Sequence, residues 1–190
     1  MPLTAFATIV GLWLCWMAYW TVASIGVKAS ARREPMLSRL LHLVPLAIAV
    51  LLLWAPAPSL PWLRLRFVET TRWIPWCGVA LVAAGLVFST WARVHLGSNW
   101  SGIVTVKRNH ELVTSGPYAF VRHPIYSGLL LAFVGSALAS GEWRGVLAVV
   151  VVAAAFWRKL RLEERWMGEQ FGGDYERYRA RVPALVPLFR

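Results

Sequence analysis

The sequence predicts an all-α, polytopic membrane protein with about five transmembrane helices and a cytoplasmic, amphipathic, helical C-terminal tail. Hydrophobic residues make up 58% of the 190 positions and charged residues only 15%, with a mean hydropathy of +0.54. Soluble domains carry about 25% charged residues. The chain also holds 12 tryptophans, a residue that collects at membrane interfaces.

The first three predicted spans form the N-terminal part of the chain, residues 1–92. A helix needs about 20 apolar residues to cross a bilayer, and such runs cover residues 3–27, 40–57 and 73–92. The first run lacks a positively charged n-region and exceeds the apolar stretch of a signal peptide, so we expect it to remain as a spanning helix. Pro45 lies inside the second run.

The C-terminal part, residues 93–190, is expected to carry the chemistry within the same structural domain. Its two apolar runs, 124–140 and 143–160, are short and are joined by Ser140-Gly141-Glu142. So tight a turn predicts an antiparallel hairpin of two helices. Because proline is favoured at the first helical position, the fourth span is expected to begin at Pro124.

The tail after the fifth span is predicted to be helical rather than disordered. Its apolar residues recur at helical spacing: Leu162, Trp166, Met167 and Phe171. The Gly172-Gly173 pair breaks this pattern. We expect Asp174 to cap a second short helix, which ends before Pro183.

Loop charges orient the predicted helices. Sixteen of the 20 basic residues fall in segments 28–39, 93–122 and 158–190, on one side of the predicted topology, and four fall on the other. The excess of positive charge predicts a cytoplasmic 93–123 loop and C-terminal tail, with the N-terminus outside. Arginine far outnumbers lysine, which is typical of a GC-rich bacterial genome, so we expect the membrane to be a bacterial inner membrane.

The net charge of +11 is expected to favour contact with the lipid bilayer, and we expect no nucleic acid as a partner. Basic residues that flank apolar spans are attracted to an anionic leaflet, and the chain contains no recognisable nucleic-acid-reading module. Cys15 and Cys77 lie inside apolar runs without metal-ligand spacing. We therefore expect neither a disulfide framework nor a metal site.

Polar groups concentrate in the stretch SGPYAFVRHPIYSG, which leads into the fourth span. Arg122 offers a fork of donors for a carboxylate, and His123 offers a hydrogen bond or a charge near neutral pH. A helix that starts at Pro124 adds backbone N–H groups that attract an anion. Gly128 allows close approach of another backbone or of a ligand. The alternative is that Arg122 and Tyr126 only anchor the chain at the membrane interface.

A second polar cluster, Glu163-Glu164, follows the fifth span. Carboxylates beside hydrocarbon are costly unless they are paired, and basic residues surround these two: Arg158, Lys159, Arg161 and Arg165. One interpretation is a solvated ladder of ion pairs. The other is that one carboxylate takes an amino group or a ribose hydroxyl of a ligand, because the hairpin should bring position 163 back near position 123.

These residues resemble the isoprenylcysteine carboxyl methyltransferase family. The similarity rests on LVTSGPYAFVRHPIYSG and EERWMGEQFGGDYERYRARVPALVPLF and extends over residues 95–189. It implies an integral membrane methyltransferase that uses S-adenosyl-L-methionine without a Rossmann domain. In that family the cofactor pocket faces the cytoplasm and is closed by the C-terminal tail.

The resemblance also implies site residues. Those implied to bind the cofactor are His110, Leu112, Val113, Tyr118, Arg122, His123, Pro124, Tyr126 and Glu163. No catalytic residue is assigned, and Arg122 and Glu164 are the candidates. The family has an arginine near the substrate, four residues before the cofactor-binding glutamate. This chain has Lys159 there, beside Arg158, and both become candidates for substrate binding.

The acceptor implied is lipophilic: a prenylated cysteine carboxylate, a phospholipid amine or another small isoprenoid. Two other classes of protein compete with a methyltransferase. NADPH-dependent sterol reductases resemble the same half of the chain but have many more spans. A non-enzymatic scaffold or small transporter needs no ligand pocket, although the first, second and fifth spans lack the mid-membrane charge of an ion path.

Overall fold

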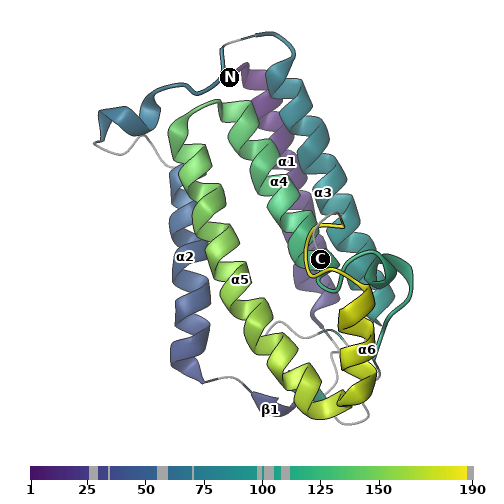
Figure 1. Cartoon of the computed structure of the whole chain (residues 1–190). Helices are drawn as coiled ribbons and strands as arrows, with labels where there is room; N and C mark the ends of the chain where they lie inside the picture. The colour runs from purple at the N-terminus through teal and green to yellow at the C-terminus, as the bar shows by residue number, and fades with distance from the viewer. Residues whose placement is uncertain are drawn as a thin grey trace.

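The computed structural model describes residues 1–25, 30–33, 35–54, 60–69, 71–97, 100, 105–107 and 112–187. Within these ranges six α-helices are formed: α1 (Leu3–Ala23), α2 (Met36–Trp54), α3 (Ile74–Leu96), α4 (Pro124–Ser140), α5 (Trp143–Phe171) and α6 (Gly173–Arg181). Short 3-10 turns lie at η1 (Pro61–Arg64) and η3 (Gly116–Ala119). The five long helices stand side by side and α6 follows the end of α5 (Figure 1), which confirms the all-α class.

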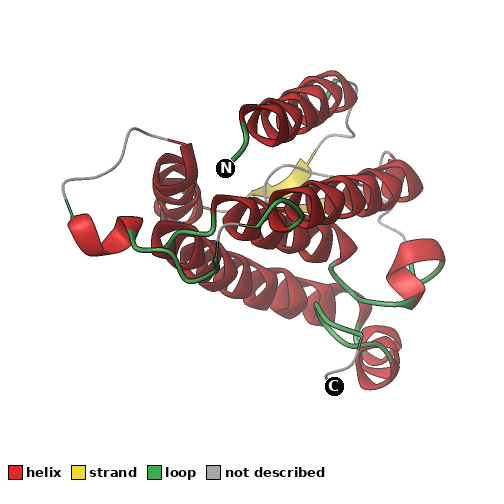
Figure 2. Ribbon diagram, turned by 90° about the horizontal axis from the view of Figure 1, so that it is seen from above, coloured by secondary structure: helices red, strands yellow, loops and turns green. Residues whose placement is uncertain are grey.

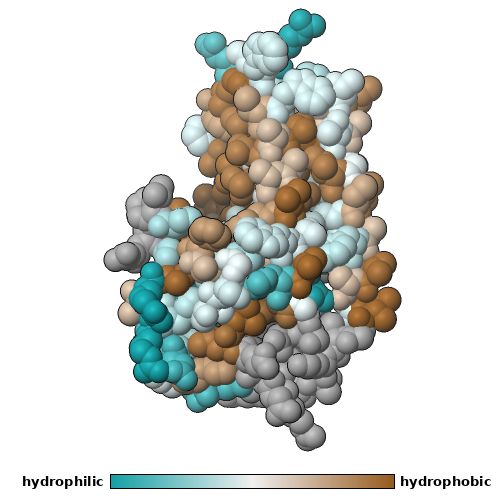
Figure 3. Space-filling model, turned by 90° about the vertical axis from the view of Figure 1, so that its right-hand side faces the viewer, coloured by the Kyte–Doolittle hydropathy of each residue, from teal (hydrophilic) through white to brown (hydrophobic). Residues whose placement is uncertain are grey.

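Three of these helices, α1, α2 and α3, are long and apolar enough to cross a membrane, and α4 is a shorter apolar helix. The fourth span was predicted over 124–140, and those are the bounds of α4. Hydrophobic residues cover much of the bundle in Figure 3, whereas hydrophilic residues gather towards its ends. These features define an integral membrane protein.

The fifth predicted span is part of a longer helix. The prediction separated a span ending at residue 160 from an amphipathic tail helix, but α5 runs without a break for 29 residues. Leucine, arginine and glutamate around residue 162 all favour helix, so nothing there stops it. Gly172, with a φ of 51°, provides the end of α5.

The predicted cap of α6 was wrong. The N-cap residue is Gly172, with no side-chain hydrogen bond, and Asp174 lies in the first turn of the helix. The Asp174 carboxylate pairs with Arg177 instead. An acidic residue still suits this position because the N-terminus of a helix carries partial positive charge.

The two ends of the bundle differ. The starts of α2 and α4, the ends of α1 and α3, the second half of α5 and α6 gather at one end (Figure 1). Residues 60–69 and the α4–α5 turn lie at the other, where Gly141 adopts a φ of 67°. A two-stranded antiparallel ribbon of β1 (Ser30–Arg33) and β2 (Thr105–Lys107) also lies at the first end; no sequence pattern predicted it.

Helix α4 is central to the packing. One cluster of buried residues joins it to α2 and α5: Ala49, Leu53, Phe133, Ala148, Val152 and Phe156. A second joins it to α1 and α3: Ile9, Val82, Leu86, Ala132 and Ala139. Figure 2 shows from above that the helices pack as one bundle.

Helices α3 and α4 approach each other closely through paired glycines. A Cβ added at Gly78 would lie 2.5 Å from the Gly135 carbonyl oxygen, and one at Gly128 would lie 2.5 Å from the Gly85 oxygen. Small residues at helix crossings allow such backbone contact in membranes. The close approach that Gly128 was expected to allow is therefore to another helix rather than to a ligand.

Candidate functional site

A buried ion pair joins the segment before α4 to the second half of α5. Glu164 Oε1 accepts hydrogen bonds from Arg122 Nε at 2.8 Å and from Arg122 Nη2 at 2.5 Å. Both side chains are only 9% exposed. Buried charges are tolerated when their partners and hydrogen bonds are in place. This pair fixes the start of α4 against α5.

His123 and Tyr126 bring the second carboxylate into the same cluster. His123 Nε2 lies 3.3 Å from Glu164 Oε1, and its Nδ1 lies 3.4 Å from Glu163 Oε2. The Tyr126 hydroxyl donates to Glu163 Oε1 at 2.5 Å. The α4–α5 hairpin thus brings position 163 next to position 123, as its short antiparallel helices predicted. We refer to Arg122, His123, Glu163 and Glu164 as the polar cluster.

The polar cluster lies just before α4 and in the second half of α5, outside the apolar runs of both helices, and its groups stabilise one another's charges. Burial opposes ionisation of Glu164, but hydrogen bonds from His123 and Arg122 outweigh it and lower the pKa of Glu164 to about 2. Burial also disfavours charge on His123, yet its bonds to Glu163 and Glu164 raise its pKa. The pKa of Glu163 is lowered: its burial is outweighed by His123 and by the charge of Lys159. Both carboxylates are therefore held ionised.

The chain after α6 closes over the start of α4. The backbone N–H of Arg122 donates to the Pro183 carbonyl at 2.9 Å, and that of His123 donates to the Ala184 carbonyl at 3.0 Å. The C-terminal segment, residues 182–185, therefore runs beside the start of α4 (Figure 1). It occupies the backbone donors of the two residues that precede α4.

The same closure uses the side chains of α6. Arg122 Nη1 donates to the carbonyl oxygens of Arg179, at 3.2 Å, and of Val182. The Tyr178 hydroxyl donates to the Tyr118 carbonyl at 2.6 Å, and burial raises the pKa of Tyr178 to about 12. All three guanidinium nitrogens of Arg122 are thus engaged within the protein. The sequence revealed the tyrosines of α6 but not these contacts, because carbonyl acceptors leave no side-chain signature.

The remaining residues implied to bind the cofactor lie around the entry to α4. Tyr118, in η3, is buried, and its ring stacks on His95 with centroids 6.4 Å apart. Leu112 and Val113 are half-buried, and Pro124 is buried as the first residue of α4. His110 lies outside the described residues.

The two candidate substrate residues lie on α5, about one turn before Glu163. Lys159 is buried, with Nζ 5.8 Å from the centre of the Tyr126 ring. Arg158 points to α2, where its Nη2 donates to Ser38 Oγ at 2.9 Å. Lys159 therefore adjoins the polar cluster directly. Arg158 instead links α5 to α2, a helix on which the sequence predicted no site residue.

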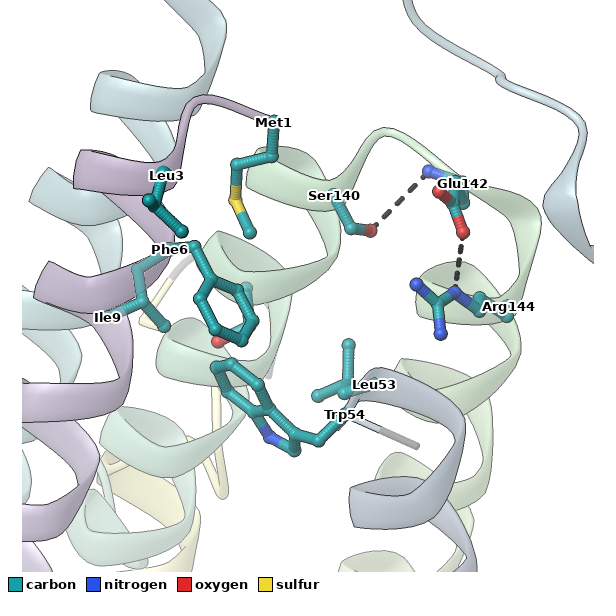
Figure 4. Close-up of a pocket in the computed structure, with 10 residues that line it drawn as sticks. Met1, Leu3, Phe6, Ile9, Leu53, Trp54, Ser140, Glu142 and Arg144 are labelled. Carbon is teal, nitrogen blue, oxygen red and sulfur yellow. Dashed lines mark hydrogen bonds and ion pairs between the residues drawn. The ribbon is translucent and has the colours of Figure 1, made fainter. Parts of the chain in front are cut away.

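A separate cavity of about 290 Å³ lies at the opposite end of the bundle. Its walls combine apolar residues of α1 and α2 with polar residues of the α4–α5 turn (Figure 4): Met1, Leu3, Phe6, Ile9, Leu53, Trp54, Ser136, Ser140, Glu142 and Arg144. Its charged residues satisfy each other, with Arg144 Nε 2.5 Å from Glu142 Oε2. None of the predicted site residues lines it.

The fold and the polar cluster together define a helical integral membrane protein with a charged site at one end of the bundle, closed by its own C-terminal segment. A family model described as "Phospholipid methyltransferase" matches residues 73–174. This range covers more than half of the chain and includes the whole polar cluster, and the chain belongs to this family.

Relatives with curated descriptions overlap the same part of the chain. A Schizosaccharomyces pombe protein described as Protein-S-isoprenylcysteine O-methyltransferase is 39% identical over 51% of this chain and 42% of its own length. An Arabidopsis thaliana Protein-S-isoprenylcysteine O-methyltransferase B is 31% identical over 61% of this chain and 60% of its own. The "Cobalt-zinc-cadmium resistance protein CzcN" of Cupriavidus metallidurans is 33% identical over 62% and 54%. The chain thus spans about half the length of the relatives it matches.

A solved structure of a eukaryotic intramembrane Ras methyltransferase, an isoprenylcysteine carboxyl methyltransferase, has a similar fold. The TM-score is 0.53 at 28% sequence identity, over 60% of this chain and 42% of that one. The likeness agrees with the all-helical intramembrane architecture.

Proposed function

We propose that the protein is an S-adenosyl-L-methionine-dependent membrane methyltransferase with a lipophilic acceptor, most like an isoprenylcysteine carboxyl O-methyltransferase. The observation that carries this proposal is the polar cluster, in which His123 contacts both Glu163 and Glu164 at 3.4 and 3.3 Å. The cluster lies inside the family match, and two relatives of at least 31% identity are described as Protein-S-isoprenylcysteine O-methyltransferases.

The donor set fits the proposed cofactor. S-adenosyl-L-methionine carries an ammonium, a carboxylate, ribose hydroxyls and a flat adenine. Glu163 is 26% exposed and Glu164 only 9%, so Glu163 is the carboxylate that can reach an ammonium or a ribose hydroxyl. His123 adds a donor beside it. Tyr118, Leu112 and Val113 offer ring and aliphatic surface for the adenine.

Arg122 and Glu164 are better suited to positioning than to direct contact. Each is 9% exposed, and each satisfies the other. We assign them the task of holding His123 and the C-terminal segment in place. From the sequence alone, these two residues were instead candidate catalytic residues.

S-adenosyl-L-methionine, when bound, supplies a methyl group already activated on a sulfonium, so the protein need not provide a strong acid. The residues of the chain then act by orientation, which is worth roughly 7–11 kcal/mol in well-aligned systems. The C-terminal segment excludes water from the site, which strengthens its electrostatic contacts.

The state of the carboxylates favours O-methylation. An amine acceptor must lose a proton, and Glu164, with a pKa of about 2, is a poor base. A carboxylate acceptor needs no base at all. The description of the matched family as phospholipid methyltransferases keeps a phospholipid amine as the second candidate acceptor.

The charge distribution supports a cytoplasmic site. The polar cluster, α6, the start of α2 and the end of α3 lie at the same end of the bundle, and basic residues that flank membrane spans favour the cytoplasmic side. We propose that the N-terminus faces outward and that the membrane is a bacterial inner membrane.

Transfer of a labelled methyl group from S-adenosyl-L-methionine, with the full-length protein in nanodiscs, tests the proposal. N-acetyl-S-farnesylcysteine and phosphatidylethanolamine serve as rival acceptors. We expect label in the farnesylcysteine ester, loss of transfer in Glu163→Gln, and normal transfer in Arg165→Gln, which removes an exposed charge from the same helix. Label only in the phospholipid would establish the second candidate, and label in neither would contradict the proposal.

A further inference from the structure

The start of α2 reaches the methyl-transfer site that we propose. Arg158 donates to Ser38 Oγ at 2.9 Å and to the Ser38 carbonyl at 3.2 Å. Further along α2, the His42 ring lies 5.9 Å from Phe156, and Phe156 stacks on Tyr126 at 4.8 Å. A continuous row of rings therefore connects α2 to the Tyr126 hydroxyl that binds Glu163.

Two polar atoms on this part of α2 are buried without a partner. Arg39 Nε and His42 Nδ1 form no hydrogen bond with any residue that the structure describes. The two side chains are three residues apart, so they lie on neighbouring turns of one helix face. Buried polar groups in native proteins are almost always hydrogen-bonded, and each exception calls for a ligand, a water or a role.

The positive charge beside them is also uncompensated. Neither Arg39 nor Arg158 forms an ion pair within the described part of the chain. The nearby Glu163 carboxylate is already bound by His123 and Tyr126. An anion from outside the chain is the group that would balance these two guanidiniums.

His42 adds a different requirement. Its Nδ1 is buried and has no hydrogen-bond partner among the described residues. A neutral imidazole protonated on its other nitrogen, Nε2, keeps a lone pair on Nδ1. The group that completes the site should therefore present an N–H or O–H to His42, next to its anion.

We infer that Arg39, His42 and Arg158 form the head-group site of the methyl acceptor, an amphiphile with a carboxylate and a neighbouring N–H. The inference rests on the proposed function and names a recognition element, on α2, for that reaction. Arg158 and Glu163 are five residues apart on α5, a rise of about 7.5 Å along the helix. The contacts of His42 with Phe156 and of Phe156 with Tyr126 place a head group held here next to the proposed cofactor residues.

Direct binding tests this site without relying on turnover. The probes are N-acetyl-S-farnesylcysteine, its neutral carboxamide, and farnesylthiopropionic acid, which lacks the amide. Affinities are measured with the full-length protein in phosphatidylcholine nanodiscs. The wild type should prefer the first probe to the carboxamide by about tenfold or more, the strength of a hydrogen bond to a charged group, and to farnesylthiopropionic acid by about fivefold, the strength of a neutral hydrogen bond.

The variants separate the two contacts. Arg39→Gln should lose the preference for the acid over the carboxamide, and His42→Leu should lose the preference for the amide-bearing acid. Arg165→Gln, an exposed charge on α5, should keep both. Ser38→Ala removes the Oγ contact of Arg158 and leaves its bond to the Ser38 carbonyl. If this variant changed the preferences as much as Arg158→Gln does, Arg158 would be only a link between helices.

Three outcomes would overturn the inference: no preference in the wild type, preferences unchanged in Arg39→Gln and His42→Leu, or loss of the acid preference on adding phosphatidylglycerol. The last would assign the site to phospholipid head groups. Methyl transfer with unaltered selectivity in the variants would leave the proposed function intact and remove the α2 site. Selective binding without methyl transfer would support the α2 site and contradict the proposed function.

Discussion

Glu164 on α5 and Arg122 before α4 form a doubly hydrogen-bonded ion pair, at 2.5 and 2.8 Å, in which each side chain is 9% exposed. Arg122 also holds the carbonyls of Arg179 and Val182. One guanidinium therefore connects the hairpin of α4 and α5 to the C-terminal segment.

Breaking this pair should release the C-terminal segment. Arg122→Gln leaves the Glu164 carboxylate buried without its main partner, which costs about 3–5 kcal/mol in comparable sites. Thermal unfolding in detergent and proteolysis of the tail would measure the loss. Arg177→Gln is the matched control, because its pair with Asp174 is 70% and 68% exposed and should contribute about 1 kcal/mol or less. Equal effects in the two variants would contradict the assigned role of Arg122.

The closed tail should be most stable between pH 4.5 and 6.5. The pKa of Glu164 falls from 4.5 to about 2, so its contribution is complete above pH 4.5 and is lost as the pH falls towards 2. The pKa of His123 is raised above 6.5, so its contribution is complete below pH 6.5 and is lost as the pH rises through the raised value.

Hydrogen exchange of the amides of Arg122 and His123, which bind the tail carbonyls, measures this dependence. Protection should be greatest within the window and should decline on both sides. His123→Gln should remove the alkaline decline and leave the acid one. Protection that does not vary with pH would contradict the coupling between the polar cluster and the tail.

Replacing a glycine at the contact between α3 and α4 with a larger residue should destabilise the protein. Gly128→Ala places a Cβ 2.5 Å from the Gly85 oxygen, and overpacking of this kind costs about 1–3 kcal/mol. Gly11→Ala is the control, because nothing lies within 4 Å of its added Cβ. Unfolding by a denaturing detergent would compare them. A stable Gly128→Ala protein would show that the two helices separate more easily than their packing indicates.

The helix bounds could be predicted where backbone chemistry fixes them. Pro124 starts α4 because its missing N–H costs nothing there, and Gly141 turns the chain because it adopts a positive φ. No such residue separates the span in α5 from its amphipathic end, so the single helix was missed. The ribbon of β1 and β2 depends on contacts between distant segments, which local patterns do not reveal.

The side chains that form the polar cluster could be predicted from the sequence, but the backbone contacts that close it could not. The hairpin of two helices predicted that His123 lies near Glu163, because a tight turn between antiparallel helices brings these two positions to the same end. The closure by Pro183 and Ala184 uses backbone carbonyl groups, which every residue has, so no sequence pattern could predict it. The polar atoms of Arg39 and His42 were missed for a related reason: their isolation from partners exists only in three dimensions.

Titration calorimetry of the purified protein with S-adenosyl-L-methionine is the most direct test of the central claim, that groups at the start of α4 and on α5 hold a nucleoside methyl donor. We predict saturable binding to the wild type, weakened about tenfold or more in Glu163→Gln through loss of a charged hydrogen bond, and unchanged in Arg165→Gln. A folded wild-type protein that releases or absorbs no heat of binding, or a Glu163→Gln variant with full affinity, would contradict it.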